Sequence, residues 1–350
     1  MKEITGIHFH YPVLRRCRNG DNWCMTWAAD GHQYTSCDDG WGWDYTGRGA
    51  KYNNRVWRLR GGPHDFQVDF LPNYPDYRER DRWYGYGIIS VKGTLYHFVT
   101  CASEGGFHYP FLGAKLFYSP DFGETWYRHD GVDARHEHRS TAQDAMFFWK
   151  ETDDYAFSCI EFLQRGRDHS LAGDGYVYLY SPNGRCRYHE LNLARVPEDC
   201  LLDREAYEFF CGLDRRGRPA WSKDIARRAP VHVFPDNYGW YSWLPCVVYN
   251  APLDTYIMVT GGTGRDGSGM HDEPASLGFY QADAPWGPWR EIFYTDEWVA
   301  DNPECRLYQP KLSPAWISPD GRTMYLVFSD ASDHWGVRYR WNQQKITLLL

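Results

Sequence analysis

The chain has 350 residues, 43% of them hydrophobic and 24% charged, so its composition is that of a folded protein and not of a disordered one. Its formal net charge of -8 disfavours a nucleic-acid partner. No apolar run reaches the roughly 18 residues of a membrane-spanning helix, so no membrane partner is expected. Aromatic residues make up 18% of the chain, which suits either sugar-binding ring faces or strand packing.

The N-terminal residues 1–16 lack the continuous apolar stretch of a signal peptide. This start fits a cytoplasmic protein, and it equally fits a secreted protein whose leader has been removed. The 10 cysteines form no CxxC pair and are irregularly spaced, so we expect mostly buried free thiols and no zinc site.

Short runs rich in aromatic and β-branched residues follow one another along the chain, separated by Gly, Pro, Asn and Asp, and helical periodicity is almost absent. One short helix is predicted over Asp203–Phe209 from the spacing of its apolar residues. No charge run or low-complexity linker divides the sequence, which predicts a single domain over residues 1–350. The predicted strands are 85–91, 94–100, 114–119, 145–150, 155–162, 176–181, 243–250, 255–262, 277–282 and 323–329.

A turn motif recurs between predicted strands. Residues Ser119–Trp126 fit the pattern S-x-D-x-G-x-T-W of the Asp box at every fixed position, and degenerate copies lie at Ser181–Gly184 and Ser318–Gly321. In such a turn the Asp accepts backbone N–H groups, the Gly adopts a positive φ and the Trp packs beneath. The motif therefore predicts tight hairpins at these places.

Repeated four-stranded units without long helices predict an all-β fold, a β-propeller, with a β-sandwich or jelly roll as the alternative. Blades of about 40–50 residues would make seven in this length. The spacing of the three turns, 62 and 137 residues, also leaves five or six blades open. The last strand, near Lys345–Leu350, should pair with the N-terminal segment, because an unclosed ring leaves two exposed edges.

Eight segments carry a resemblance to a known family: Trp23–Gly31, Asp38–Gly42, Glu161–Asp168, Asp174–Tyr178, Leu193–Val196, Tyr207–Phe210, Asp283–Trp289 and the final SPDGRTMYLVFSD. Together they resemble carbohydrate-active propellers of the sialidase-like group, which includes ulvan lyases and L-rhamnose-α-1,4-D-glucuronate lyases and rhamnosidases. The F/Y-R-I-P motif of true sialidases is absent, so sialidase activity is not expected.

The resemblance implies a lyase that cleaves next to a uronic acid, here glucuronate, by β-elimination. That reaction needs a cation on the uronate carboxylate, a base for the C5 proton and an acid for the leaving oxygen. His108 is the first candidate for the base, and Tyr238 and Tyr178 are candidate catalytic tyrosines. His138 can also contact substrate, because the His-Glu-His spacing puts it beside His136 on one face of an extended segment. A surface or structural loop is the alternative for each of these residues except Tyr178.

Arg195 lies in an apolar stretch and therefore needs an anionic partner, which could be the substrate carboxylate or, equally, an Asp of another blade. Arg165 is a second candidate for the same role. Trp240 and Tyr241 belong to a loop dense in aromatic residues that resembles a sugar-stacking platform. His64 is a further binding candidate, because Asp65 could orient it. The partner expected from these residues is an acidic oligosaccharide or polysaccharide.

Two other functions remain open. A glycoside hydrolase on the same fold would use a pair of carboxylates, for which Asp30, Asp39, Asp144 and Glu161 are candidates. A non-catalytic glycan-binding propeller would use the aromatic residues alone. No cofactor is required by any of these functions, and a structural calcium ion is compatible with the acidic pairs Asp38-Asp39 and Asp153-Asp154. The Gly-rich stretch 261–269 is expected to be a flexible loop that could cover a substrate.

Overall fold

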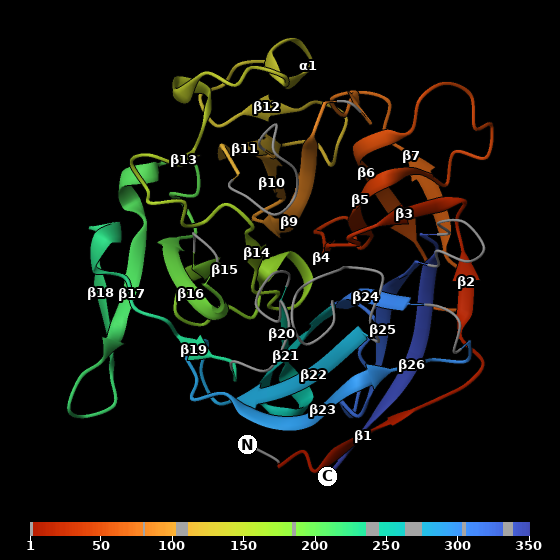
Figure 1. The fold of residues 1–350 in the computed structure, drawn as a ribbon, viewed down its shortest axis with the longest axis vertical. Coiled ribbons are helices and arrows are strands. Elements are labelled where there is room, and N and C mark those ends of the chain that lie inside the picture. The colour runs from red at the N-terminus through yellow and green to blue at the C-terminus, as the bar shows by residue number, and fades with distance from the viewer. Residues whose placement is uncertain are drawn as a thin grey trace.

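The computed structural model describes residues 3–79, 81–102, 111–183, 187–235, 245–262, 275–302, 306–331 and 339–350. Within these ranges the strands form five antiparallel sheets, and Figure 1 shows them arranged around a common axis. The fold is therefore the predicted β-propeller, with five blades. Five is one of the counts that the turn spacing left open, and the described residues do not form the seven blades of a 40–50-residue repeat, because each blade uses longer strands and connections.

The first two blades occupy the N-terminal half of the chain. In the first, β3 and β4 lie nearest the axis, and in the second β9 does. The first blade comprises β3 (Asn19–Asp21), β4 (Met25–Trp27), β5 (Gln33–Gly42), β6 (Tyr52–Arg60), β7 (Gln67–Phe70) and β8 (Tyr77–Arg78). The second comprises β9 (Trp83–Val91), β10 (Thr94–Cys101), β11 (Gly113–Ser119), β12 (Tyr127–Arg128) and β13 (Phe148–Trp149), with the helix α1 (Ala134–Glu137) at its rim.

The third and fourth blades follow in the same way, with β14 and β20 as their inner strands. The third comprises β14 (Glu161–Phe162), β15 (Tyr176–Asn183), β16 (Arg187–Pro197), β17 (Glu208–Leu213), β18 (Pro219–Ser222) and β19 (His232–Val233). The fourth comprises β20 (Cys246–Asn250), β21 (Thr255–Gly262), β22 (Ala275–Ala282) and β23 (Arg290–Trp298). Short 3₁₀ turns lie at Gln143–Ala145, Arg167–His169, Arg204–Ala206, Ile225–Arg227 and Ala251–Leu253.

The fifth blade joins the two ends of the chain. It comprises β24 (Arg306–Leu312), β25 (Thr323–Ala331), β26 (Trp341–Leu349), β1 (Gly6–Phe9) and β2 (Leu14–Arg16). The strand β1 pairs with β26, with Gly6 opposite Leu349 and Phe9 opposite Ile346. This is the predicted closure of the ring. It removes the two open edges that the first and last strands would otherwise present.

The predicted helix over Asp203–Phe209 is wrong. Only one 3₁₀ turn forms there, at Arg204–Ala206, with the Asp203 side chain accepting a hydrogen bond from the Glu205 amide at its start. The strand β17 then begins at Glu208. The apolar spacing of this short segment is typical of a helix, but tertiary packing overrides it. Phe209 packs in the core between blades as part of a strand.

Two other predicted elements are much shorter than expected. Only Phe148–Trp149 is strand in the segment 145–150, and only Glu161–Phe162 in the segment 155–162. The remaining residues of these segments form turns, although Phe147 and Phe157 are buried. Burial between blades, and not strand pairing, explains their apolar character.

The buried apolar side chains form five clusters in the described part of the chain, one between each pair of neighbouring blades. The first cluster, for example, joins strands of the fourth and fifth blades, and it includes Val248, Phe279 and Phe328. Stability therefore comes from face-to-face packing of sheets, which leaves the axis itself to polar side chains.

The turn chemistry predicted at Ser119–Trp126 is present. The Asp121 carboxylate accepts hydrogen bonds from the Thr125 amide (2.8 Å) and hydroxyl (2.6 Å), and Gly123 has a φ of 94°. The Trp126 ring is buried beneath the turn. At the copy Ser318–Gly321 the Ser318 hydroxyl accepts the Thr323 amide (2.8 Å). Part of the copy at 181–184 lies outside the described residues.

Eight cysteines lie in the described ranges, and all eight are free thiols. Five of them are buried and three are partly exposed, in agreement with the sequence-based expectation. No helix among the described residues is long and apolar enough to cross a membrane.

Candidate functional site

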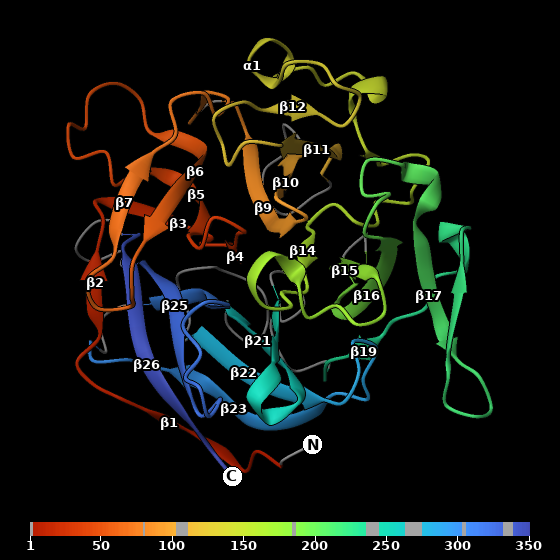
Figure 2. The ribbon, with the colours of Figure 1, turned by 180° about the vertical axis from the view of Figure 1, so that it is seen from behind.

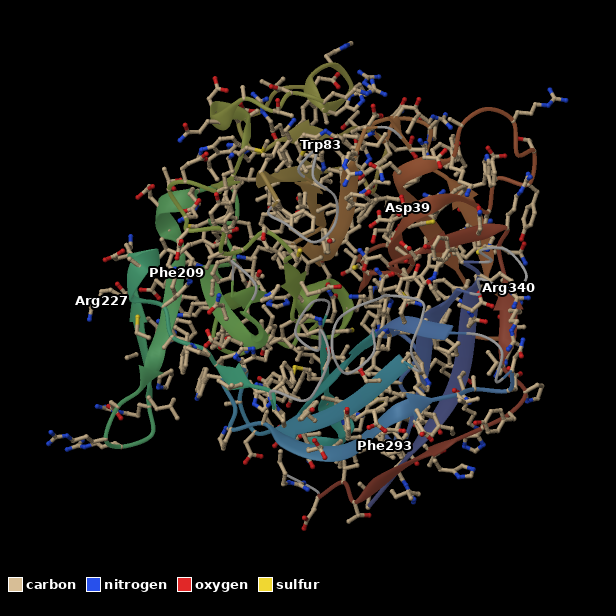
Figure 3. All side chains as sticks on the ribbon, viewed as in Figure 1. Asp39, Trp83, Phe209, Arg227, Phe293 and Arg340 are labelled. Atoms are coloured by element: carbon tan, nitrogen blue, oxygen red, sulfur yellow. The ribbon has the colours of Figure 1, made fainter. Side chains whose placement is uncertain are left out.

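Three carboxylates gather near the axis on the first blade. Asp21 ends the inner strand β3 and lies directly opposite Asp38 on β5 in the antiparallel register. Asp39 follows with a φ of 49°, at the irregularity where the pairing of β3 and β5 shifts. Figure 3 labels Asp39 on this orange-red blade, beside the blade that carries Trp83. We call Asp21, Asp38 and Asp39 the axial carboxylates.

Two glycines allow this close approach. A Cβ atom at Gly40 would collide with the backbone of Asn19 and Gly20, so only glycine lets β5 pass so near β3. A Cβ at Gly85, on β9, would collide with the Asn54 side chain. Gly85 brings its backbone amide within 2.9 Å of Asp38 Oδ1 instead.

Each axial carboxylate accepts a hydrogen bond from a different strand. The Tyr308 hydroxyl of β24 donates to Asp21. The Asn22 amide donates to Asp38 Oδ2 (3.1 Å), and the Asn53 amide of β6 donates to Asp39 Oδ1 (3.1 Å). Donors from the first and fifth blades, with the Gly85 amide of the second, therefore orient the cluster.

Burial and mutual repulsion keep these carboxyl groups from ionising easily. Burial raises the pKa of Asp21 well above its ordinary value, and the charge of Asp39 raises it further. Burial and then the charge of Asp21 raise the pKa of Asp38 in the same way. Burial raises the pKa of Asp39 to about 6, although the Asn53 hydrogen bond and Lys51 oppose the shift. Mutual repulsion therefore disfavours ionisation of Asp21 and Asp38 at the same time.

A buried ion pair lies alongside the axial carboxylates. Glu161, the first residue of β14, and Lys311 of β24 meet at 2.5 Å, with side chains only 5% and 1% exposed. The Cys24 thiol donates to Glu161 Oε1 (2.7 Å) and also lies 3.3 Å from Asn22 Oδ1. Through Asn22, whose amide bonds Asp38, one hydrogen-bonded network joins inner strands of the first, third and fifth blades.

Four of the residues predicted for the site lie outside the described residues. They are His108, Tyr238, Trp240 and Tyr241. The catalytic roles predicted for His108 and Tyr238 therefore stay predictions. The loop predicted at 261–269 also lies outside the described ranges, except for Gly261 and Gly262 at the end of β21.

The two predicted arginines are paired within the third blade. Arg195 on β16 binds Glu208 of the adjacent strand (Nε to Oε2, 2.8 Å) and stacks on Tyr176 and Trp221. The acidic partner therefore comes from the same sheet and not from another blade. Its carboxylate is the expected anion for an arginine in an apolar stretch.

Arg165 binds the Asp174 carboxylate at 2.5 Å with a side chain 3% exposed, and it lies over the Tyr178 ring. The Tyr178 hydroxyl donates to the same Asp174 (2.9 Å). Burial, and then Asp174, raise the pKa of this tyrosine. Arg165 and Tyr178 therefore lie together because both bind the Asp174 carboxylate. No hydrogen bond or ion pair within the described residues links them to the axial carboxylates.

Of the three predicted histidines, the two that lie in the described residues are on different parts of the propeller. His138 follows α1 at the rim of the second blade, where its Nδ1 lies 3.2 Å from the Arg135 carbonyl and its ring packs against Tyr77. Burial lowers the pKa of His138. His64 lies near the first and fifth blades, with Nε2 3.0 Å from the Tyr325 hydroxyl. Asp65, the predicted orienting residue, accepts the Gly62 amide instead.

The carboxylates considered for a hydrolase divide into two groups. Asp39 and Glu161 lie near the axis, as described above. Asp30 accepts the Tyr34 hydroxyl (2.7 Å) and the His32 amide (3.0 Å), so it orders its own hairpin. Asp144 is exposed in the 3₁₀ turn at Gln143–Ala145.

Sequence reasoning missed Asp21 and Lys311. Asp21 belongs to the short segment Asn19-Gly-Asp21, which reads as a turn, and β3 has only three residues. No local signal marks Lys311 as buried either, because the polar residues Gln309 and Ser313 lie two positions to either side of it. The acidic pair Asp153-Asp154, considered above for a structural calcium ion, binds arginines: Asp153 pairs with Arg204 and Asp154 with Arg228. Among the described residues no group of three or more His, Cys, Asp or Glu could hold a metal ion.

Comparison with family models gives one match, a domain of unknown function (DUF4185), over residues 86–343. This match spans more than two thirds of the chain. The chain belongs to this family. The matched region includes most of the inner strand of the second blade and the inner strands of the third to fifth blades. Asp21 and the other axial carboxylates precede it. No curated protein matches the chain.

Solved structures share the fold at low sequence identity. A Bacteroides ovatus protein provisionally described as a hydrolase is 14% identical with a TM-score of 0.54, covering 94% of this chain and 87% of its own. A GH62 hydrolase solved with xylotriose is 10% identical with a TM-score of 0.52, covering 95% and 92%. The GH43 protein BlXynB of Bacillus licheniformis is 10% identical with a TM-score of 0.50, covering 95% of this chain and 54% of its own. These likenesses establish the fold.

Proposed function

We propose that this propeller is a carbohydrate-active enzyme that hydrolyses glycosidic bonds at the axial carboxylates. The observation that carries the proposal is the pairing of Asp21 and Asp38 at the axis, with Asp39 beside them. Glycoside hydrolysis needs one protonated carboxyl group to protonate the leaving oxygen and one ionised carboxylate to activate water or attack the sugar. A cluster whose members repel one another supplies protonated and ionised carboxyl groups at the same pH.

The roles follow from exposure and pKa. Asp39 is the axial carboxylate with the greatest exposure, and its pKa of about 6 suits a proton donor near neutral pH. Asp21 and Asp38 are nearly covered, and their repulsion disfavours ionisation of both at once; we assign the ionised form, and therefore the base, to Asp21. The solved relatives support a sugar substrate, because one of them is a hydrolase in complex with xylotriose. A neutral glycan suits a net charge of -8 and three clustered carboxyls better than a uronate does.

The uronate lyase suggested by the sequence remains the alternative, together with the wider resemblance to ulvan lyases and rhamnosidases. Its support is weaker, because Arg165 and Arg195 already have acidic partners in the third blade. The third hypothesis is a propeller that binds glycans without cleaving them. An aromatic cleft would be enough for such binding, and Asp21 and Asp38 would have no catalytic role.

Product analysis distinguishes the three functions. We expect reducing sugar to be released from a neutral glycan such as a xylan, without the ultraviolet absorbance of an unsaturated uronate. A panel should also hold uronate-containing glycans, including ulvan and gum arabic side chains. Absorbance from a new C4=C5 double bond would establish the lyase instead. Glycan binding without any product would contradict both enzymatic functions and support the non-catalytic glycan-binding propeller.

The pH dependence gives a prediction specific to Asp39. Because its protonated form is the proposed donor, kcat/KM should fall as the pH rises through about 6. The same shift affects stability. The folded state holds the proton more tightly than an unfolded chain with a pKa near 3.8, so stability is lost as the pH rises from about 4 to 6. Asp39→Asn should remove that loss of up to about 3 kcal/mol, which urea unfolding at several pH values measures. An unchanged pH profile of stability in Asp39→Asn would contradict the raised pKa.

A further inference from the structure

A cavity of about 450 Å³ lies between the first and fifth blades, away from the axial carboxylates. It is bounded by the end of β4, the start of β5, the residues after β6 and the connection from β24 to β25. Gln33 of the cavity begins β5, whereas Asp38 lies five residues further along the same strand. At the usual rise of a strand these two residues are about 17 Å apart. Figure 2 shows the molecule from the side opposite to Figure 1, with the β24–β25 connection in view.

Aromatic side chains dominate the walls of this cavity. Trp27 ends β4 and is partly exposed, while Trp316 and Tyr325 come from the fifth blade. Each is fixed by a hydrogen bond at its polar atom. The Trp27 indole donates to the Gly31 carbonyl (3.2 Å), the Trp316 indole to the Gly61 carbonyl (3.4 Å), and the Tyr325 hydroxyl lies 3.0 Å from His64. Rigid rings from two blades therefore present pre-organised apolar surface.

The polar groups of the lining are uncharged. Gln33, Ser318 and Thr323 contribute amide and hydroxyl groups, and none of the lining residues is Asp, Glu, Lys, Arg or His. Gln33 is 2% exposed, and its Oε1 accepts the Ser313 hydroxyl (2.6 Å), which fixes the orientation of the amide. Its Nε2 has no hydrogen-bond partner among the described residues. A buried donor of this kind is costly unless a ligand hydroxyl or a water meets it.

We infer that this cavity, lined by Trp27, Gln33, Trp316 and Tyr325, is a binding site for a neutral saccharide, separate from the axial carboxylates. The apolar faces of a sugar ring match indole and phenol rings, and its hydroxyl groups match an amide and hydroxyls without a net charge. A charged ligand would lose its hydration there without finding a counter-charge. The volume suits one to three sugar rings. The inference does not depend on hydrolysis at the axis.

Equilibrium binding tests the inference directly. Cellotriose, xylotriose and mannotriose are titrated into the full chain, followed by calorimetry and by tryptophan fluorescence. We expect at least one to bind, and Trp27→Ala to weaken it by about tenfold or more, as loss of one stacking surface would. Trp27→Phe, which keeps a ring, should retain most of the affinity. Gln33→Leu should weaken binding without removing it.

The controls separate this site from the axis and from misfolding. Tyr45→Ala removes an exposed ring that lines a different cavity, beside Trp43 and Phe70, and should leave the affinity unchanged. Asp38→Asn should also leave it unchanged, whether or not it affects hydrolysis. Circular dichroism and thermal unfolding verify that Trp27→Ala is folded. Absence of binding by all three trisaccharides, or equal affinity in folded Trp27→Ala, would overturn the inference. So would tighter binding of uronate trisaccharides than of neutral ones.

Discussion

Replacing Asp21 by Asn is expected to lower kcat for glycan hydrolysis by about 100-fold or more, while the protein becomes no less stable. The amide oxygen can still accept the Tyr308 hydroxyl, so the local geometry is kept. The amide cannot ionise, however, so it cannot act as the base that we assign to Asp21. The same change removes a buried carboxyl whose pKa burial has raised, and with it the repulsion that this group exerts on Asp38. The free energy of unfolding near pH 7 should therefore stay constant or rise.

The combination of lost activity and retained stability is what distinguishes a reacting group from a structural one. Kinetics on a soluble oligosaccharide and urea unfolding measure the two properties on the same preparation. Asp144→Asn is the matched control, because it neutralises an exposed carboxyl in a surface turn and should change neither property. Full activity in Asp21→Asn would refute the catalytic role of the axial carboxylates. Lost activity together with a large loss of stability would point to a structural role instead.

Replacing Lys311 by Met is expected to destabilise the protein by about 3–5 kcal/mol. The change leaves Glu161 as an uncompensated negative charge within a network where both side chains are almost fully covered. The Cys24 thiol, which donates to Glu161, cannot neutralise that charge. Urea unfolding of Lys311→Met against the parent protein measures the loss.

A double-mutant cycle separates the ion pair from simple loss of packing. Glu161→Gln alone should also destabilise, because it strands the buried ammonium group. Lys311→Met combined with Glu161→Gln should recover much of the loss, since no unpaired charge remains. Additive losses in the double variant would show that the two side chains are not coupled. A loss below about 1 kcal/mol in Lys311→Met would show that water reaches the pair.

The strand content was predictable because short runs of aromatic and β-branched residues are bounded by turn-forming residues. The segments 94–100, 114–119, 255–262 and 323–329 all fall on observed strands. The same patterns failed where apolar residues pack between blades without pairing, as at 155–162. The strands before residue 80 were not assigned, because β3, β4 and β8 have only two or three residues each and because the longer β5 and β6 are rich in polar and charged residues. A pattern of period two needs more residues than the short strands provide.

The site was only partly predictable. Asp39 and Glu161 were named as carboxylate candidates, but nothing local in the sequence distinguishes them from Asp30, which orders its own hairpin. Arg195 was correctly expected to need an anionic partner, and the sequence could not say that Glu208 supplies it. The pair of Lys311 and Glu161 spans 150 positions, so no local pattern relates them.

The sequence by itself determined that this chain folds as sheets joined by tight turns and that its ends pair, because β-propensity, turn chemistry and edge protection depend on a few neighbouring residues. The number of blades, and which acids lie together at the axis, were decided by the tertiary structure. Burial and the charge of a distant residue set the pKa of Asp21 and Asp38, and both arise only when strands remote in sequence are brought side by side.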